Sequence, residues 1–348
     1  ILGDDLKSGI KMDPSDPIGK IFYNVQKLLL GLKYKGFLLA ICSKNEENNA
    51  LDALFYSTPS VFKKEDIVTY RINWNSKSDN VKSICNELGL SFKETIFIDD
   101  NIYECDEVKK NCEGISIFKV PKDIYQFPYL IKSSSLFEVN TVTEEDKNRT
   151  RLYQEKSKRT KLLKEFSNSK SSRENWLKSL DTNLIINQIK DDSKYLQRII
   201  QLFNRTNQFN LQSSKYNNNS FIKKINLKDF KYYYGIVSDR IGSEGLISVV
   251  GYREDKDYIY VNDYILSCRV FNRYIEELML LPLLKLAHKK DLGIKFEIKK
   301  SDRNIVSTKF VKKISNNTES INKDLISNLL NRYINLPVSI KISHNIIC

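Results

Sequence analysis

The chain has 348 residues, of which 41% are hydrophobic and 28% charged, a balance typical of a soluble globular protein long enough for two domains. It holds no run of the roughly 18 uncharged apolar residues that a membrane span needs and no signal-peptide pattern, so we expect a cytoplasmic protein outside the membrane. The formal net charge of +13 favours acidic partners such as phosphorylated metabolites, an acidic carrier protein or nucleic acid. Lysines interleaved with Asn and Ser are equally compatible with a solvated surface.

Cysteine and histidine usage argues against a zinc site or a disulfide framework. The sequence contains six cysteines but no Cys-x-x-Cys pair, and its only histidines are His288 and His344. Metal-binding cysteines and histidines normally recur at short, regular spacings, which are not found here.

The first 120 residues alternate between helix and strand patterns. Asp16 and Pro17 predict a helix start, apolar residues at helical spacing follow up to Leu32, and Gly36 predicts its end. We then expect strands at 37–42, 67–72, 95–98 and 115–118 and helices at 46–57, 78–88 and 102–112. This alternation predicts an α/β fold with a doubly wound parallel sheet, in which ligands bind at the carboxyl ends of the strands.

The pattern changes after the first 135 residues, which we assign to one domain. Residues 136–180 are polar, charge-rich and helical in spacing, so we expect a helical linker. From residue 181 the order predicts a second, α+β domain, 181–348. Its expected strands are 184–189, 231–239, 244–253, 257–267, 294–299 and 338–343, and its expected helices are 193–204, 273–290, 304–313 and 321–333.

Three polar features follow strands of the first domain. Asp99 and Asp100 come directly after an apolar strand, where their oxygens suit Mg²⁺. Ser43 ends an earlier strand and is placed to bind a phosphate oxygen, and Lys77 would add a positive charge. Taken singly, the Asp pair and Ser43 are as well explained as helix caps, and Lys77 as a solvated charge.

Together these stretches resemble the haloacid dehalogenase superfamily, subfamily IIIC, in its FkbH-like branch. The matching segments are Ile1–Asp5, Leu39–Asn45, Arg71–Lys77 with Asn80, and Phe97–Asn101 with Glu104. The resemblance implies an Mg²⁺ enzyme in which Asp99 and Asp100 hold the metal, Ser43 and Lys77 are catalytic, and Asn45 contacts substrate. It also implies that a first motif with a nucleophilic aspartate, and with it the central strand of the sheet, stands immediately before Ile1. We therefore expect the chain to begin inside a domain. Cys105 replaces the arginine that is usual after the glutamate.

Two stretches of the second domain are candidates for acyl transfer. The run 202–210 is rich in amides, and Asn207, Gln208 and Asn210 could bind a polar substrate, although a polar helix end is the simpler interpretation. Cys268 ends a strand before an expected helix, where helix amides, Arg269 and Arg273 would favour its thiolate. A lone cysteine in such a place is more often a small buried residue.

Both stretches resemble the C-terminal half of FkbH-like proteins, which is similar to GNAT acyltransferases. The resemblance implies that an acyl phosphate of glycerate is the small phosphorylated donor and that glycerate passes as a thioester to an acyl carrier protein. Cys268 matches the family's Ser-Cys-Arg cysteine, the candidate transient acceptor, and Arg269 would contact substrate. Asn272 and Tyr274 stand where GNAT folds have the glycines that cradle coenzyme A, which argues against coenzyme A binding.

Three other functions remain open at this point. One is a plain phosphatase whose second domain only recognises substrate, and another is a non-catalytic carrier-binding or scaffold protein. Nucleic-acid binding is the weakest of the three, because aromatic and basic residues do not interleave in a recognised motif.

Overall fold

The computed structural model describes residues 13–56, 60–139, 142–168, 173–189 and 194–343. The chain divides into two compact units, Ile1–Gln154 and Glu155–Cys348. The predicted linker, 136–180, contributes residues to each unit. Within the described residues, no helix is both long enough and apolar enough to cross a membrane.

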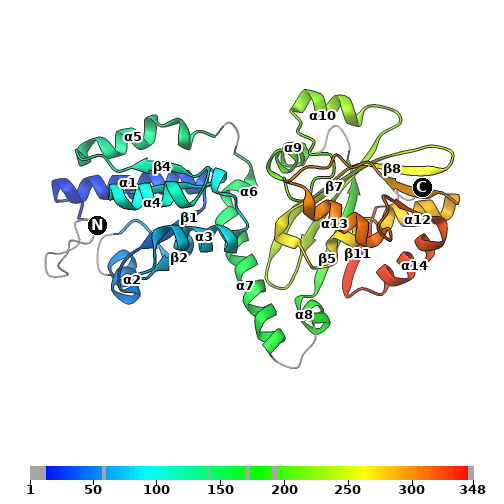
Figure 1. Cartoon of the computed structure of the whole chain (residues 1–348), viewed down its shortest axis with the longest axis horizontal. Coiled ribbons are helices and arrows are strands. Elements are labelled where there is room, and N and C mark those ends of the chain that lie inside the picture. The colour runs from blue at the N-terminus through cyan, green and yellow to red at the C-terminus, as the bar shows by residue number, and fades with distance from the viewer. Residues whose placement is uncertain (1–12, 57–59, 140–141, 169–172, 190–193, 344–348) are drawn as a thin grey trace. The chain divides into compact units, whose positions relative to one another are not determined.

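The first unit alternates helices and strands in the predicted order (Figure 1). The side chain of Asp16 accepts a hydrogen bond from the amide of Gly19 and so caps the first helix, and Gly36 lies just past its end with a φ of 93°. The elements are α1 (Pro17–Tyr34), β1 (Leu39–Ser43), α2 (Glu47–Phe55), β2 (Ile67–Ile72), α3 (Lys77–Leu88), β3 (Ile96–Asp99), α4 (Ile102–Asn111), β4 (Ser116–Lys119), α5 (Phe127–Ser133) and α6 (Glu144–Lys147).

The strands of the first unit pair in parallel, as predicted, but form two separate sheets. Strand β1 pairs with β2 and β3 pairs with β4, and each sheet has two strands among the described residues. Helices α1 and α5 cover one side of β3 and β4 around Phe118, and α3 and α4 cover the other around Phe97. Parallel strands covered by helices are confirmed, whereas one continuous doubly wound sheet remains a prediction.

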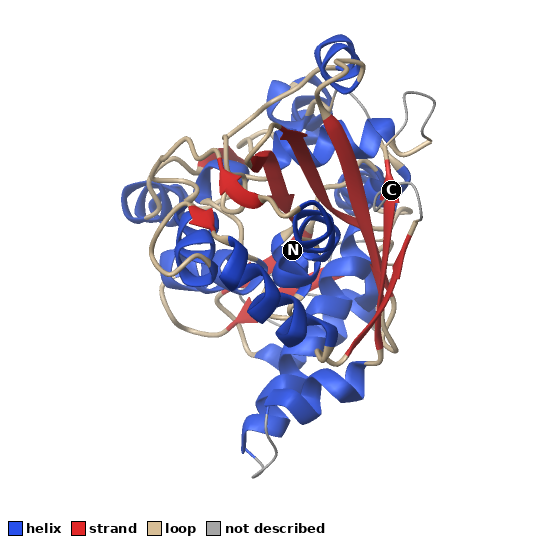
Figure 2. Cartoon of the chain, turned by 90° about the vertical axis from the view of Figure 1, so that its right-hand side faces the viewer, coloured by secondary structure: helices blue, strands red, loops and turns tan. Residues whose placement is uncertain are grey.

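The second unit is built on a seven-stranded mixed sheet with the strand order β10-β9-β8-β7-β6-β5-β11. Figure 2 draws the strands of the chain in red. Helix α7 (Arg149–Asn168) runs into this unit. The elements that follow are α8 (Arg173–Leu180), β5 (Thr182–Gln188), α9 (Leu196–Arg205), α10 (Asn218–Ile225), β6 (Lys231–Ser238), β7 (Ser243–Glu254), β8 (Tyr258–Leu266), α11 (Ile275–Leu278), α12 (Leu281–Lys290), β9 (Gly293–Phe296), α13 (Ile305–Ile314), β10 (Ser320–Ile321), α14 (Lys323–Ile334) and β11 (Val338–Ile342).

Both faces of this sheet are packed. Successive side chains of a strand point to opposite faces, so the neighbours Tyr232 and Tyr233 of β6 enter different cores. Tyr233 lies in the larger core with α12, α13 and α14, and Tyr232 lies in the smaller core with α9 and α10. The sheet is therefore covered by helices on both faces.

The predicted helix at 273–290 is wrong as a single element. The structure instead has the one-turn helix α11 and then α12, which carries Pro282 in its first turn. Proline has no amide hydrogen to donate, so it fits the first turn of a helix and interrupts one that is already running. Helices α5 and α10 and the short strand β10 were not predicted.

Candidate functional site

Lys77 and Asp99 form a close ion pair where β3 ends and α3 begins. The Nζ of Lys77 lies 2.5 Å from the Oδ2 of Asp99, and their side chains are only 13% and 7% exposed. The other carboxylate oxygen of Asp99 accepts a hydrogen bond from the amide of Asn101 at 2.9 Å. A lysine held this deep beside an aspartate is not the solvated surface charge that was the simpler interpretation of Lys77.

Two hydrogen bonds link the segment around Ser43 to the loop after β2 and to Lys77. The carbonyl of Ser43 accepts from the amide of Asn73 at 3.1 Å, which joins the end of β1 to the loop after β2. The neighbouring Cys42 thiol donates to the carbonyl of Lys77 at 3.8 Å. The ends of β1 and β2 and the start of α3 are therefore held together. Ser43 and Asn45, two residues further on, are both partly buried.

The helix-cap interpretations of Ser43 and of the Asp pair do not match the structure. Helix α2 begins after Glu46 without a side-chain cap, so Ser43 does not cap it. Helix α4 is capped by Asn101, whose side chain accepts from the amide of Tyr103 at 2.9 Å. Asp99 is buried and Asp100 is exposed at the same strand end, and neither is the cap.

The end of β3 is rich in carboxylates. Lys44 pairs with Glu104 at 2.5 Å, and this bond raises the pKa of Lys44. Burial raises the pKa of the Cys42 thiol to about 11, and the charges of Asp99 and Glu104 add to that rise, so Cys42 stays protonated at neutral pH. Cys42 is therefore not a candidate nucleophile.

The oxygen donors at this strand end fit Mg²⁺. The described residues contain no cluster of three or more His, Cys, Asp or Glu side chains arranged for a metal. Magnesium is commonly bound by one or two carboxylates, with water and phosphate completing its six ligands. Asp99 and Asp100 are carboxylates, the ligand type that Mg²⁺ prefers. The oxygens of Asp99 are bonded to Lys77 and to the amide of Asn101.

Trp74, in the loop after β2, is a feature to which sequence reasoning gave no role. It is 69% exposed, yet its indole nitrogen donates to Glu46 at 2.8 Å. The preceding Asn73 is fixed by its bond to Ser43 and by a bond from the side chain of Asn80 at 2.9 Å. An exposed indole is thus presented on a well-fixed loop beside Ser43.

In the second unit, Cys268 lies two residues after Leu266, the last residue of β8, near the predicted strand end. It opens a short turn, Cys268–Val270, and its thiol is free and partly buried. The expected helix does not follow at once, because α11 begins only after Tyr274. Helix amides therefore do not lie immediately after Cys268.

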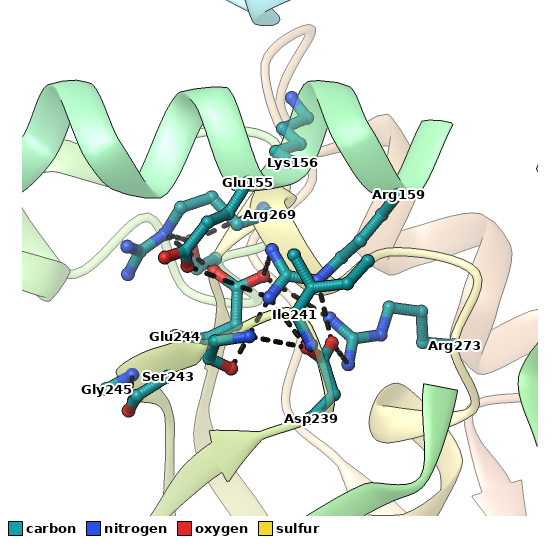
Figure 3. Close-up of polar contacts among 12 residues, drawn as sticks. Glu155, Lys156, Arg159, Asp239, Ile241, Ser243, Glu244, Gly245, Arg269 and Arg273 are labelled. Carbon is teal, nitrogen blue, oxygen red and sulfur yellow. Dashed lines mark hydrogen bonds and ion pairs between the residues drawn. The ribbon is translucent and has the colours of Figure 1, made fainter. Parts of the chain in front are cut away.

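The two arginines expected beside Cys268 instead enter a buried ionic network (Figure 3). Arg273 lies 2.6 Å from Asp239 and 3.3 Å from Glu244, and the Nε of Arg269 lies 3.8 Å from Glu244. Arg159 of α7 binds Asp239 at 2.7 Å and Glu244 at 2.8 Å. The carboxylates at the β6–β7 turn thus hold both α7 and the segment after Cys268.

The network was missed because its members come from distant parts of the sequence. Burial alone would raise the pKa of Asp239, but the hydrogen bond from Arg159 and the charge of Arg273 lower it, so Asp239 is ionised. The available signal was the presence of Asp239 and Glu244 at the ends of two otherwise apolar strands.

The amide-rich stretch and the Cys268 stretch lie side by side. Asn210 forms a β-bridge with Ile265, and the carbonyl of Phe209 accepts from the amide of Leu266 at 3.1 Å. The chain then continues two residues from Leu266 to Cys268. Sequence reasoning singled out these two stretches separately, and the structure places them together at one end of β8.

Segment 209–211 occupies the opening between β8 and the chain that follows β9. The two parallel strands pair as far as Val261 and Phe296. Beyond that point Leu211 donates to Tyr264 at 3.2 Å and accepts from Lys299 at 3.0 Å, so it is bonded on both sides. An extended ligand cannot insert between these strands while the chain's own segment lies there.

The three amides of this stretch have different surroundings. Asn210 is fully buried, and its side chain bonds to Thr206 at 3.3 Å and to Ser214 at 3.1 Å, which closes the loop. Asn207 is partly buried and accepts from Lys215 at 3.1 Å, and Gln208 is exposed. Gln208 is therefore the most accessible of the three predicted substrate contacts.

The turn after Cys268 has the backbone of a glycine-rich loop without its glycines. Asn272 and Tyr274 have φ values of 64° and 62°, in the left-handed region that favours glycine. Arg173 donates to the carbonyl of Asn272 at 2.6 Å and lies over the ring of Tyr274. Side chains thus fill the positions at which a loop for pyrophosphate would need glycine.

No family model and no curated protein matches the chain. Among solved structures, the N-terminal part of BF1531 from Bacteroides fragilis, containing a phosphatase domain complexed with Mg, is 30% identical over 40% of this chain, with a TM-score of 0.39. The aligned region spans 38% of that BF1531 structure. PaiA N-acetyltransferase from Thermoplasma acidophilum, in complex with coenzyme A, is 14% identical over 38% of this chain and 87% of its own, with a TM-score of 0.28. The ribosomal-protein-S18-alanine N-acetyltransferase from Escherichia coli is 8% identical over 34% of this chain and 69% of its own, with a TM-score of 0.27.

Proposed function

We propose that this chain is part of an Mg²⁺-dependent acyl-phosphate phosphatase that transfers a glyceryl or related acyl group to an acyl carrier protein. The observation that carries the proposal is the buried Lys77–Asp99 pair at the end of β3, bonded through Cys42 to the end of β1. The specific substrate is taken from the resemblance of the same residues to the FkbH-like motifs.

In the first unit, each proposed role follows from position. Asp99 and Asp100 would hold Mg²⁺, which neutralises charge on the transferring phosphate when bound. Ser43 would donate its hydroxyl to a phosphate oxygen, and Lys77 would place its ammonium beside that phosphate. The resemblance also implies a nucleophilic aspartate in a first motif, so turnover is assayed on the complete gene product.

In the second unit, Cys268 is the proposed acyl acceptor. Its thiol would attack the acyl carbon, the bond from that carbon to the phosphate oxygen would break, and phosphate would leave with the electron pair and the thiol's proton. The thiol of the carrier would then take the acyl group and return a proton to Cys268. Gln208, exposed on the stretch paired with the end of β8, is the proposed contact for the acyl group's hydroxyls.

A plain phosphatase is the second candidate, and specific contacts favour it. The side chains of Arg269 and Asn210 have partners within the unit, so they contribute less to an open catalytic site than the sequence suggested. In that case the second unit recognises the substrate and Cys268 is not needed.

The test is intact mass spectrometry of a holo acyl carrier protein after incubation with the complete gene product, Mg²⁺ and glyceryl phosphate donors, alongside phosphate release. We expect a glyceryl mass on the carrier, and we expect Cys268→Ala to abolish it. Phosphate release without any carrier adduct would support the plain phosphatase. If neither phosphate release nor a carrier adduct is found, a non-catalytic carrier-binding protein is the remaining candidate.

A further inference from the structure

Helix α13 presents a mixed apolar and basic face to solvent. Ile305 is 49% and Val306 is 40% exposed, and Lys309, Lys312 and Lys313 are exposed on the same side. At 3.6 residues per turn these five side chains span an arc of about 120°. The opposite side, with Ser307, Phe310, Val311 and Ile314, is buried. We call the five exposed residues the α13 face.

The surroundings of the α13 face are strongly basic. Residues 299–313 contain six cationic side chains and a single acid, Asp302. Lys300 pairs with Glu319 at 3.0 Å and Lys313 with Glu277 at 3.5 Å. Lys309 and Lys312 form no ion pair with any residue that the structure describes. A solvated lysine run explains the charge, but it does not explain two exposed aliphatic side chains within it.

The α13 face lies next to the candidate acyl-transfer stretch of the same unit. On the buried side of α13, the ring of Phe310 packs on Phe209, with the ring centroids 5.4 Å apart. The amide of Ser307 donates to the carbonyl of Gln208 at 3.4 Å. Phe209 is bonded to Leu266, two residues before Cys268. A partner seated on α13 would therefore lie beside the end of β8.

We propose that the α13 face is the docking surface for an acidic acyl carrier protein. The inference rests on the proposed function and adds where the carrier binds. Ile305 and Val306 form the small apolar centre that is buried on binding, and the lysines around them attract and orient the carrier's carboxylates. A nucleic acid would use the lysines, but its phosphates gain nothing from two aliphatic side chains.

The test is fluorescence anisotropy with a labelled acyl carrier protein that carries its phosphopantetheine arm. The variants are Lys309→Glu/Lys312→Glu for charge and Ile305→Ser/Val306→Ser for the apolar centre. The matched control is Lys109→Glu/Lys110→Glu, which makes the same charge change at exposed positions at the end of α4. All these side chains are exposed, and circular dichroism checks that the variants fold.

We expect both α13 variants to weaken carrier binding at least tenfold, and the control to weaken it less than threefold. Phosphate release without carrier should be unchanged in every variant. Equal weakening by the control, or unchanged binding by both α13 variants, would overturn the docking surface while leaving the proposed function intact. If the unaltered protein binds no carrier, the carrier part of the proposed function fails as well.

Discussion

Replacing Asp239 by asparagine should destabilise the second unit strongly. Asp239 accepts from Arg159 at 2.7 and 2.9 Å and from Arg273 at 2.6 Å. The network of Figure 3 balances three arginines with three carboxylates, counting Arg269, Glu155 and Glu244. The substitution keeps the shape but leaves one buried positive charge without compensation, which costs about 3–5 kcal/mol.

The assay is urea unfolding followed by tryptophan fluorescence. The chain has two tryptophans, and in a Trp74→Phe background the remaining Trp176, only 4% exposed, reports on the second unit alone. Adding Arg273→Met to Asp239→Asn restores the charge balance, so the double variant should lose at least about 1 kcal/mol less than the sum of the single losses. A loss below about 1 kcal/mol for Asp239→Asn, similar to that of the exposed control Asp229→Asn, would refute the reasoning.

Further predictions concern pH, backbone strain and ligands. Burial and the charge of Glu277 raise the pKa of Glu276 to about 7, so its ionisation opposes folding. The free energy of unfolding should therefore fall by up to about 3 kcal/mol between pH 4.5 and 7. Glu276→Gln should remove that fall in urea titrations at each pH. Asn272→Gly should change the free energy of unfolding by less than about 1 kcal/mol, whereas Asn272→Val should cost about 1–2 kcal/mol, because a β-branched residue resists a φ of 64°. In a Trp176→Phe variant, Mg²⁺ with an acyl phosphate should protect Trp74 from acrylamide quenching, because its loop lies beside Ser43; equal quenching with and without ligand would contradict phosphate binding at Ser43. Coenzyme A should give no binding heat in calorimetry, because segment 209–211 occupies the opening beside β8.

Local signals in the sequence predicted the elements of the first unit well. Asp16, Pro17 and Gly36 act on their immediate neighbours, so the helix ends they predicted agree with the structure to within one or two residues. The division of the strands into two separate pairs was not predicted, because pairing depends on contacts across the fold.

The candidate sites were predictable in part for the same reason. Asp99 and Lys77 could be proposed together because parallel strands bring their carboxyl ends to one edge. The surroundings of Arg269 and Asn210 depend on partners far away in sequence or on the path of a loop. Arg269 is paired with Glu244, and the side chain of Asn210 is bonded across the turn to Ser214. Local sequence patterns predict neither contact.

A crystal structure of the complete gene product soaked with Mg²⁺ and phosphate tests the central claim most directly. The account predicts Mg²⁺ about 2.1 Å from an oxygen of Asp99, with one phosphate in contact with both the Ser43 hydroxyl and the Lys77 ammonium. Phosphate bound elsewhere, or metal that binds equally well in Asp99→Asn, would contradict it.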